Sequence, residues 1–178
     1  MFLNLLLICL LSGCGKSIEP RFLIENDHVG PLTRTTGLDE ISQLFAGDSL
    51  VRDSTDTDIG SSHSRIEVYQ KGGGHLLTIT PTADSLKRIG NIRVLDPRFT
   101  TKEGVGLGST FEDIRSHYPI RKIVTSINNV VIFIKGKDYY FTISREELPA
   151  NLRYRKGLQV EEVQIPDQAK IKYLMVGW

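Results

Sequence analysis

The sequence predicts an α+β fold, built as a tandem repeat of two small units that each pack one helix on an antiparallel β-sheet. Two observations predict this fold. A helical pattern of apolar residues at 36–45 recurs at 109–118, and a pattern of paired strands at 66–80 recurs without gaps at 130–144. A unit of this size buries little core by itself.

The helix of each unit is predicted from residue spacing and from signals at its ends. Both segments place apolar side chains at i, i+3, i+6 and i+7, which is typical of an amphipathic helix. Ser109 and Glu112 have the spacing of a capping box at the second helix. We expect the helices to end near Gly47 and before Pro119, because glycine favours a left-handed cap and proline cannot continue the hydrogen-bond ladder.

The strands are predicted from alternation and turn residues. Each hairpin turns at a Lys-Gly pair, Lys71-Gly72 in the first unit and Lys135-Gly136 in the second. Further strands are expected at 49–51 and 122–124 before the hairpins, at 89–95 and 160–165 after them, and at 170–178 as a final edge strand. These elements divide the body into residues 23–98 and residues 99–178, the second unit carrying the C-terminal strand.

The composition excludes several classes of protein. The chain has 178 residues, of which 40% are hydrophobic, with 22 basic and 21 acidic side chains and a formal net charge of +1. These values are those of an ordinary globular protein, so disorder, coiled coil, collagen and a disulfide scaffold are disfavoured. A near-neutral chain has no long-range field to attract a polyanion, and we therefore expect no nucleic-acid partner.

The N-terminal segment carries the most specific functional signal. An apolar run at residues 2–11 has the length of a signal-peptide core and is too short to cross a ~30 Å hydrocarbon layer, which takes about 20 helical residues. The run is followed by Leu11-Ser12-Gly13-Cys14, which resembles the lipobox of bacterial lipoproteins. The residues before the run depart from the usual pattern, since they contain no Lys or Arg.

This resemblance implies a lipid anchor. Residues 1–13 would be a signal peptide, Cys14 would carry a thioether-linked diacylglycerol and an optional acyl chain on the new amine, and residues 14–22 would be a lipidated tether. Cleavage removes Cys9 and leaves the mature chain without a disulfide. Gly15 replaces the aspartate that retains many lipoproteins at the inner membrane, which favours the outer membrane. The alternatives are a signal peptide without lipid and a buried N-terminal strand.

The body has a weaker resemblance. Its duplicated arrangement resembles the tandem fold of β-lactamase-inhibitor-protein-like domains. The turn at 106–110 before Phe-Glu-Asp-Ile is similar to the helix start in small outer-membrane assembly lipoproteins of the SmpA/OmlA kind, whereas the first unit has Pro-Leu-Thr-Arg-Thr at 31–35 in place of the glycines. The resemblance implies a sheet face that grips another protein, without catalytic residues or a cofactor.

Two loops have residue types that can bind ions. The turn from Gly104 to Ser109 opens a helix, where free N–H groups can hold an anion. It lacks the ending of a nucleotide loop, and a tight turn into a capped helix is the simpler interpretation. Asp53, Asp56 and Asp58 could hold calcium, but their loop lacks the ligand spacing and a solvated loop is the simpler interpretation.

The histidines and serines give no motif for a metal or for hydrolysis. The four histidines, at positions 28, 63, 75 and 117, form no pair at helical spacing, and we expect no metal site. Ser61, Ser62, His63 and Asp56 are close in sequence, but no Gly-x-Ser-x-Gly motif surrounds the serines. We therefore expect no catalytic residues and no enzyme activity.

The second hairpin predicts a partner surface. If Val130, Ile132 and Ile134 face the core, then Val131, Phe133 and Tyr140 are left for an apolar outer face. An exposed apolar patch of this kind marks a binding site. Tyr69 of the first hairpin and the basic pair Arg153 and Arg155 are further candidates, since Tyr and Arg are enriched at binding hot spots. The alternative is that these side chains are covered by the first unit or by the C-terminal segment.

The sequence therefore leads to one preferred function. We expect a non-enzymatic envelope lipoprotein, anchored in the membrane by lipid, whose body binds another protein or assists envelope assembly. A small-ligand or anion binder using the Gly104–Ser109 turn is a second hypothesis, and a hydrolase acting on envelope material is a third.

Overall fold

The structure of this chain, a computed structural model, describes residues 18–53, 65–83, 88–154, 157 and 159–178. These residues form twelve strands, three α-helices and three 3₁₀ helices (η). In chain order they are η1 Pro20–Phe22, β1 Leu23–Ile24, β2 His28–Val29, β3 Leu32–Thr33, α1 Ile41–Leu44, β4 Asp48–Asp53, β5 Arg65–Gln70, β6 His75–Pro81, β7 Ile89–Val94, β8 Thr100–Thr101, α2 Phe111–His117, β9 Ile120–Thr125, β10 Asn129–Ile134, β11 Tyr139–Ser144, η2 Arg145–Glu147, α3 Ala150–Arg153, η3 Glu162–Gln164 and β12 Ile171–Gly177.

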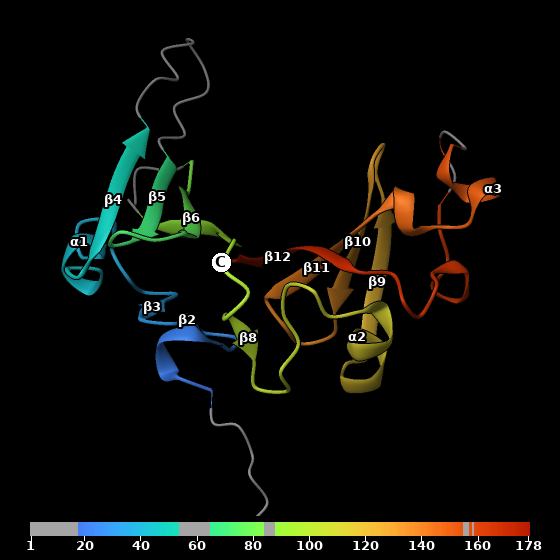
Figure 1. The fold of residues 1–178 in the computed structure, drawn as a ribbon, viewed down its shortest axis with the longest axis horizontal. Coiled ribbons are helices and arrows are strands. Elements are labelled where there is room, and N and C mark those ends of the chain that lie inside the picture. Colours follow the sequence, from blue (N-terminus) through green and yellow to red (C-terminus); the bar gives the residue numbers. More distant parts are fainter. Residues whose placement is uncertain (1–17, 54–64, 84–87, 155–156, 158) are drawn as a thin grey trace, which may run out of the picture.

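The strands make two sheets. The larger has eight strands in the order β4-β5-β6-β7-β12-β11-β10-β9, and every neighbouring pair in it is antiparallel. The smaller has four strands of two residues each, in the order β3-β2-β1-β8. Figure 1 shows β12 crossing the middle of the molecule, with the small sheet and α2 on one side of it.

This architecture corrects the predicted fold class. The chain is mostly β, and the described residues do not form two helix-on-sheet repeats. The large sheet runs without a break across the expected boundary at residue 98, because β7 of the first unit pairs with β12 of the second from Val94↔Leu174 to Asn91↔Gly177. The two predicted units therefore share one sheet.

The helices are shorter than the apolar spacing predicts. The first is one turn, Ile41–Leu44, because the residues before it are held otherwise: the Thr36 hydroxyl accepts a hydrogen bond from Thr33 N, and Gly37 bridges to Arg88. The second helix, Phe111–His117, begins one residue later than expected. Its capping box is formed by Thr110 and Asp113 instead of Ser109 and Glu112.

Most predicted strands are confirmed, with two corrections. Both hairpins and the strands at 48–53, 89–94 and 120–125 are present. The strand expected at 160–165 is absent, and Glu162–Gln164 forms a 3₁₀ turn. The expected C-terminal edge strand, β12, lies at the centre of the sheet, where it pairs with both β7 and β11.

One hydrophobic core lies on the inner face of the large sheet. Its buried side chains run from Phe22, which is the last residue of the predicted tether, to Val176. The alternation is clearest in β10, where Val130, Ile132 and Ile134 are buried and the residues between them are half-buried. A body of residues 15–178 keeps all of these elements and is expected to fold. Among the described residues, no helix is long and apolar enough to span a membrane.

Candidate functional site

The candidate site is the face of the large sheet that points away from the core, called the open face below. Its side chains alternate along each strand with the buried ones and are half-buried or exposed. In sheet order from β5 to β9 the open face carries Glu67, Tyr69, Thr78, Arg93, Tyr173, Met175, Tyr140, Val131, Phe133, Lys122 and Val124.

A single row of side chains crosses six neighbouring strands of this face. Strand pairing places Thr78 beside Arg93, Arg93 beside Met175, and so on through Tyr140 and Phe133 to Lys122. Adjacent strands lie about 4.8 Å apart, so the row is about 24 Å long. It presents two aromatic rings and a thioether between two cations.

The charge of these six strands has one sign. From β6 to β9, none of the strand sequences contains Asp or Glu, whereas four basic residues are present: Arg93, Arg121, Lys122 and Lys172. None of the four forms an ion pair with a described residue. Elsewhere in the described chain Arg21, Arg34, Arg98 and Arg115 are each paired with an aspartate. The near-neutral total charge therefore hides a locally cationic surface.

The cations of the open face lie against aromatic rings. The Arg93 guanidinium lies 4.1 Å from the centre of the Tyr173 ring, and its Nε has no hydrogen-bond partner among the described atoms. The Lys122 ammonium is 4.8 Å from the centre of Phe133, whose ring stacks on Tyr140 at 5.1 Å. Such contacts hold the cations in place without neutralising them, which leaves them available to an anionic group.

The comparisons with known proteins address the fold. The fold of this chain is similar to that in the crystal structure of the uncharacterized protein yfeY from Escherichia coli. The TM-score is 0.63 at 20% sequence identity, and the match covers 87% of this chain and 99% of that chain. At this identity the likeness shows the fold alone. No family model matches this chain, and none of the curated proteins does.

The structure separates the predicted partner-binding residues. Val131, Phe133 and Tyr140 lie together on the open face. Tyr69 is on the same face but in β5, four strands from β11, or about 19 Å. Arg153 lies at the end of α3, away from the face.

Several predicted sites lie outside the described residues. They include the lipidation site Cys14 and Arg155, and also Asp56, Asp58, Ser61, Ser62 and His63 of the loop considered for calcium or hydrolysis.

The first-unit part of the open face holds a small polar cluster. His75 Nε2 lies 2.7 Å from Glu67 Oε2, and the His75 ring stacks on Tyr69 with 4.2 Å between the ring centres. The Thr78 hydroxyl donates to the same Glu67 carboxylate at 2.6 Å. The Glu67 carboxylate is therefore already in contact with two side chains of the open face, His75 and Thr78.

The glycine turn before α2 uses its amides internally. Gly104 N donates to Thr101 O, Gly106 N to the Ser109 hydroxyl, and Ser109 N to Gly106 O. Gly104 and Gly108 adopt positive φ angles of 82° and 89°, a conformation that other residues rarely take. These contacts are those of a tight turn into a capped helix.

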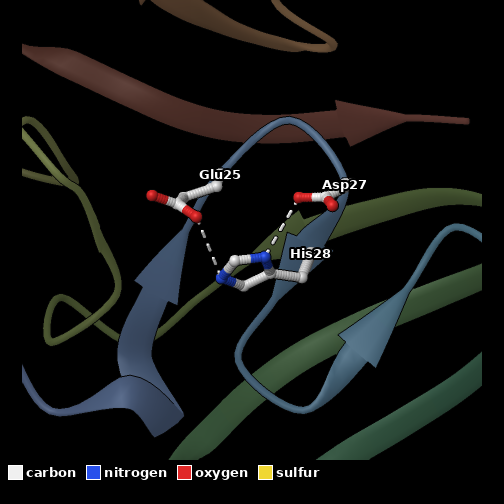
Figure 2. A group of neighbouring side chains, drawn as sticks. All are labelled: Glu25, Asp27 and His28. Carbon is white, nitrogen blue, oxygen red and sulfur yellow. Dashed lines mark hydrogen bonds and ion pairs between the residues drawn. The ribbon is translucent and has the colours of Figure 1, made fainter.

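A cluster of three side chains in the β1–β2 turn could hold a cation (Figure 2). His28 Nδ1 lies 3.1 Å from Asp27 Oδ1, and His28 Nε2 lies 3.5 Å from Glu25 Oε2. All three residues come from one short, partly exposed turn, and each nitrogen of the imidazole already faces a carboxylate. The contacts among these three side chains therefore account for their arrangement without a bound cation.

A buried tyrosine pair lies beneath the small sheet. The Tyr118 hydroxyl donates to Glu103 Oε2 and is hydrogen-bonded to the buried Thr101 hydroxyl, each at 2.5 Å. Burial, together with the hydrogen bond to Glu103, raises the pKa of Tyr118, and burial raises the pKa of Tyr139 to about 12. Burial also disfavours the charge on Glu103, but hydrogen bonds from Tyr118 and from main chain outweigh it, so the pKa of Glu103 lies below its usual value.

The geometry of the described residues gives no positive sign of catalysis. His28 and His75 contact carboxylates, and His117 Nδ1 contacts the Asp113 carbonyl. The raised pKa values of the two buried tyrosines keep their hydroxyls protonated, which does not suit a general base. These contacts bring no hydroxyl or thiol nucleophile to a described histidine.

Arg93, Met175, Tyr173 and Lys122 belong to the open face but were not predicted from the sequence. The absence of acidic residues from strands at 89–94, 120–125 and 171–177 was a readable signal. Their placement in one row depends on β12 lying between β7 and β11, which no local pattern shows.

Proposed function

We propose that this chain is a bacterial envelope lipoprotein, anchored through Cys14, whose open face binds an acidic surface of another envelope protein without catalysing a reaction. The observation that carries the binding role is the row from Arg93 to Lys122, which joins unpaired cations to half-buried aromatic rings on a face without carboxylates from β6 to β9. The lipobox at 11–14 supports the anchor, and Gly15 favours the outer membrane.

The physical argument for a protein partner combines two terms. Aromatic rings and arginine contribute most at the centre of protein interfaces, where they are desolvated on binding. Cations that lack internal partners favour a surface of opposite sign and exclude a basic one. An acidic protein surface with apolar side chains at its centre satisfies both terms.

The binding role is tested by photo-crosslinking from the open face in the native envelope. A photoreactive phenylalanine analogue is placed at position 133, and the crosslinked protein is identified by mass spectrometry and purified. We expect that protein to bind the body of residues 15–178 with an affinity that falls as salt increases. Arg93→Glu and Lys122→Glu should each weaken binding about tenfold or more without lowering the melting temperature.

Matched variants separate binding from folding. Val51→Ser changes an exposed apolar side chain at the β4 edge of the same sheet and should leave affinity unchanged. Phe133→Ser with Tyr140→Ser should abolish binding while the fold is kept. If that double variant unfolds, the charge reversals alone decide. Unchanged affinity in both reversals would contradict the proposal.

The anchor is tested separately by metabolic labelling with an alkyne analogue of palmitate. We expect Cys14→Ser to lose the label and Cys9→Ser to keep it, because Cys9 would be removed with the signal peptide. Label that persists in Cys14→Ser would refute the anchor and leave the open face untouched as a binding site.

A further inference from the structure

A second surface feature lies at the end of the sheet, away from the open-face row. It is a groove of about 1030 Å³ between the β9–β10 turn, the first two residues of η2 and the end of α3. Figure 1 shows α3 and the β9–β10 turn at one corner of the molecule, far from η1, where the described chain begins. The groove is therefore distinct from the predicted tether.

Two large apolar side chains on the lining of this groove are exposed to solvent. Ile127, at the tip of the β9–β10 turn, is 87% exposed, and Tyr154, directly after α3, is 84% exposed. A single exposed apolar residue is ordinary, but two that share one groove form a local apolar surface.

A buried arginine holds the two supports together. Arg145 is 7% exposed, and its guanidinium donates to Leu152 O in α3 at 2.6 Å and to Ser126 O and Ile127 O in the turn at 3.4 and 3.5 Å. These bonds fix the turn that carries Ile127 against the helix that precedes Tyr154. The two apolar side chains are thus presented as a pair.

The groove is also cationic. Arg145, Arg153 and Lys172 line it against one carboxylate, Glu146. Arg153 is an exposed lining residue, and its Nε donates to Leu148 O at 2.6 Å.

We propose that this groove is a docking site for an anionic lipid surface. An isoleucine and a tyrosine suit the boundary between headgroups and acyl chains, where an apolar body and a polar tip are both accommodated. Lysine and arginine beside them attract phosphate headgroups, each by an amount that corresponds to about a fivefold change in affinity. The site needs no lipid on Cys14, and Lys172 is the one residue that it shares with the four cations counted on the strands from β6 to β9.

The test measures sedimentation of the unlipidated body, residues 15–178, with vesicles. Vesicles of phosphatidylglycerol should bind it, and vesicles of phosphatidylcholine should bind it much less. Arg153→Gln with Lys172→Gln should weaken binding about 25-fold, from about fivefold for each cation. Ile127→Ser with Tyr154→Ser should weaken it at least tenfold on both kinds of vesicle.

The controls lie elsewhere on the same surface. Val163→Ser alters a side chain that is 88% exposed but is not part of the groove, and Lys102→Gln removes an exposed cation that does not line the groove either. Both should bind as the parent does. Equal weakening by the controls would overturn the proposal, as would failure to bind phosphatidylglycerol vesicles. Binding of glycerol phosphate in the groove, without any binding to vesicles, would also overturn the proposal and would assign the groove to a free anion.

Discussion

Replacing Tyr118 by phenylalanine should destabilise the protein in a way that depends on pH. The hydroxyl of Tyr118 joins the Thr101 hydroxyl to the Glu103 carboxylate, each at 2.5 Å, and the tyrosine side chain is 5% exposed. The phenylalanine variant keeps the ring in the core and removes only this hydroxyl. Both of its hydrogen bonds are therefore lost without a cavity.

The expected loss at pH 7 is about 2 kcal/mol. A hydrogen bond to a charged group contributes about 1.5–3 kcal/mol and one between neutral groups about 1 kcal/mol, and the exposure of Glu103 places the first near its lower limit. The folded-state pKa of Glu103 lies below its usual value, so this contribution is present above the unfolded pKa and is lost as pH falls through the folded pKa. The deficit should shrink towards about 1 kcal/mol at an acid pH below the folded pKa of Glu103.

Urea unfolding followed by circular dichroism measures this difference at both pH values. The parent and the Tyr118→Phe variant are compared through their midpoints, provided that the slope of the transition is the same in both. A deficit at acid pH, below the folded pKa of Glu103, that equals the deficit at pH 7 would refute the assigned role of Glu103. A deficit below about 0.5 kcal/mol at pH 7 would refute the role of the whole hydrogen-bonded group.

Two further predictions concern the backbone and the alkaline limit. Gly30→Ala should lower the melting temperature by several degrees in a thermal scan, because Gly30 has a φ of 54° and an added Cβ would lie 2.3 Å from Arg21 O; an unchanged value would contradict the close approach. Burial raises the pKa of Tyr139 to about 12, so the contribution of this tyrosine to stability should be constant below about pH 10 and fall as pH rises from there towards 12. Absorbance at alkaline pH checks this, since full ionisation of all six tyrosines near pH 10 in the folded protein would exclude the shift.

Local patterns in this sequence identify strands well and helices poorly. Both hairpins follow from alternation and from Lys-Gly turns, and β5, β6, β10 and β11 are present at those positions. The apolar spacing of residues 36–45 also fits a helix, but the helix is limited to residues 41–44. The residues before it are held in other contacts, which Thr33, Thr36 and Gly37 form. Tertiary contacts therefore decided the length of the helix.

One part of the candidate site could be predicted from the sequence, and the other part could not. Val131, Phe133 and Tyr140 follow from the alternation of a single hairpin, and the structure places them together on the outward face. Arg93 and Met175 join them through pairings between strands far apart in sequence. The register between strands that are distant in sequence depends on the whole sheet, so no short segment of the sequence predicts it.

The position of β12 has a consequence for how the protein is made. Residues 171–177, the last of the described strands in chain order, form the strand that joins β7 to β11. Until they are complete, the chain holds two separate groups of strands, each with an unpaired edge where the other will attach. Contacts between distant segments form slowly, so the large sheet stays incomplete until this strand has been synthesised. In the export that we propose for this chain, late closure of the sheet favours a polypeptide that is not yet fully folded during transport.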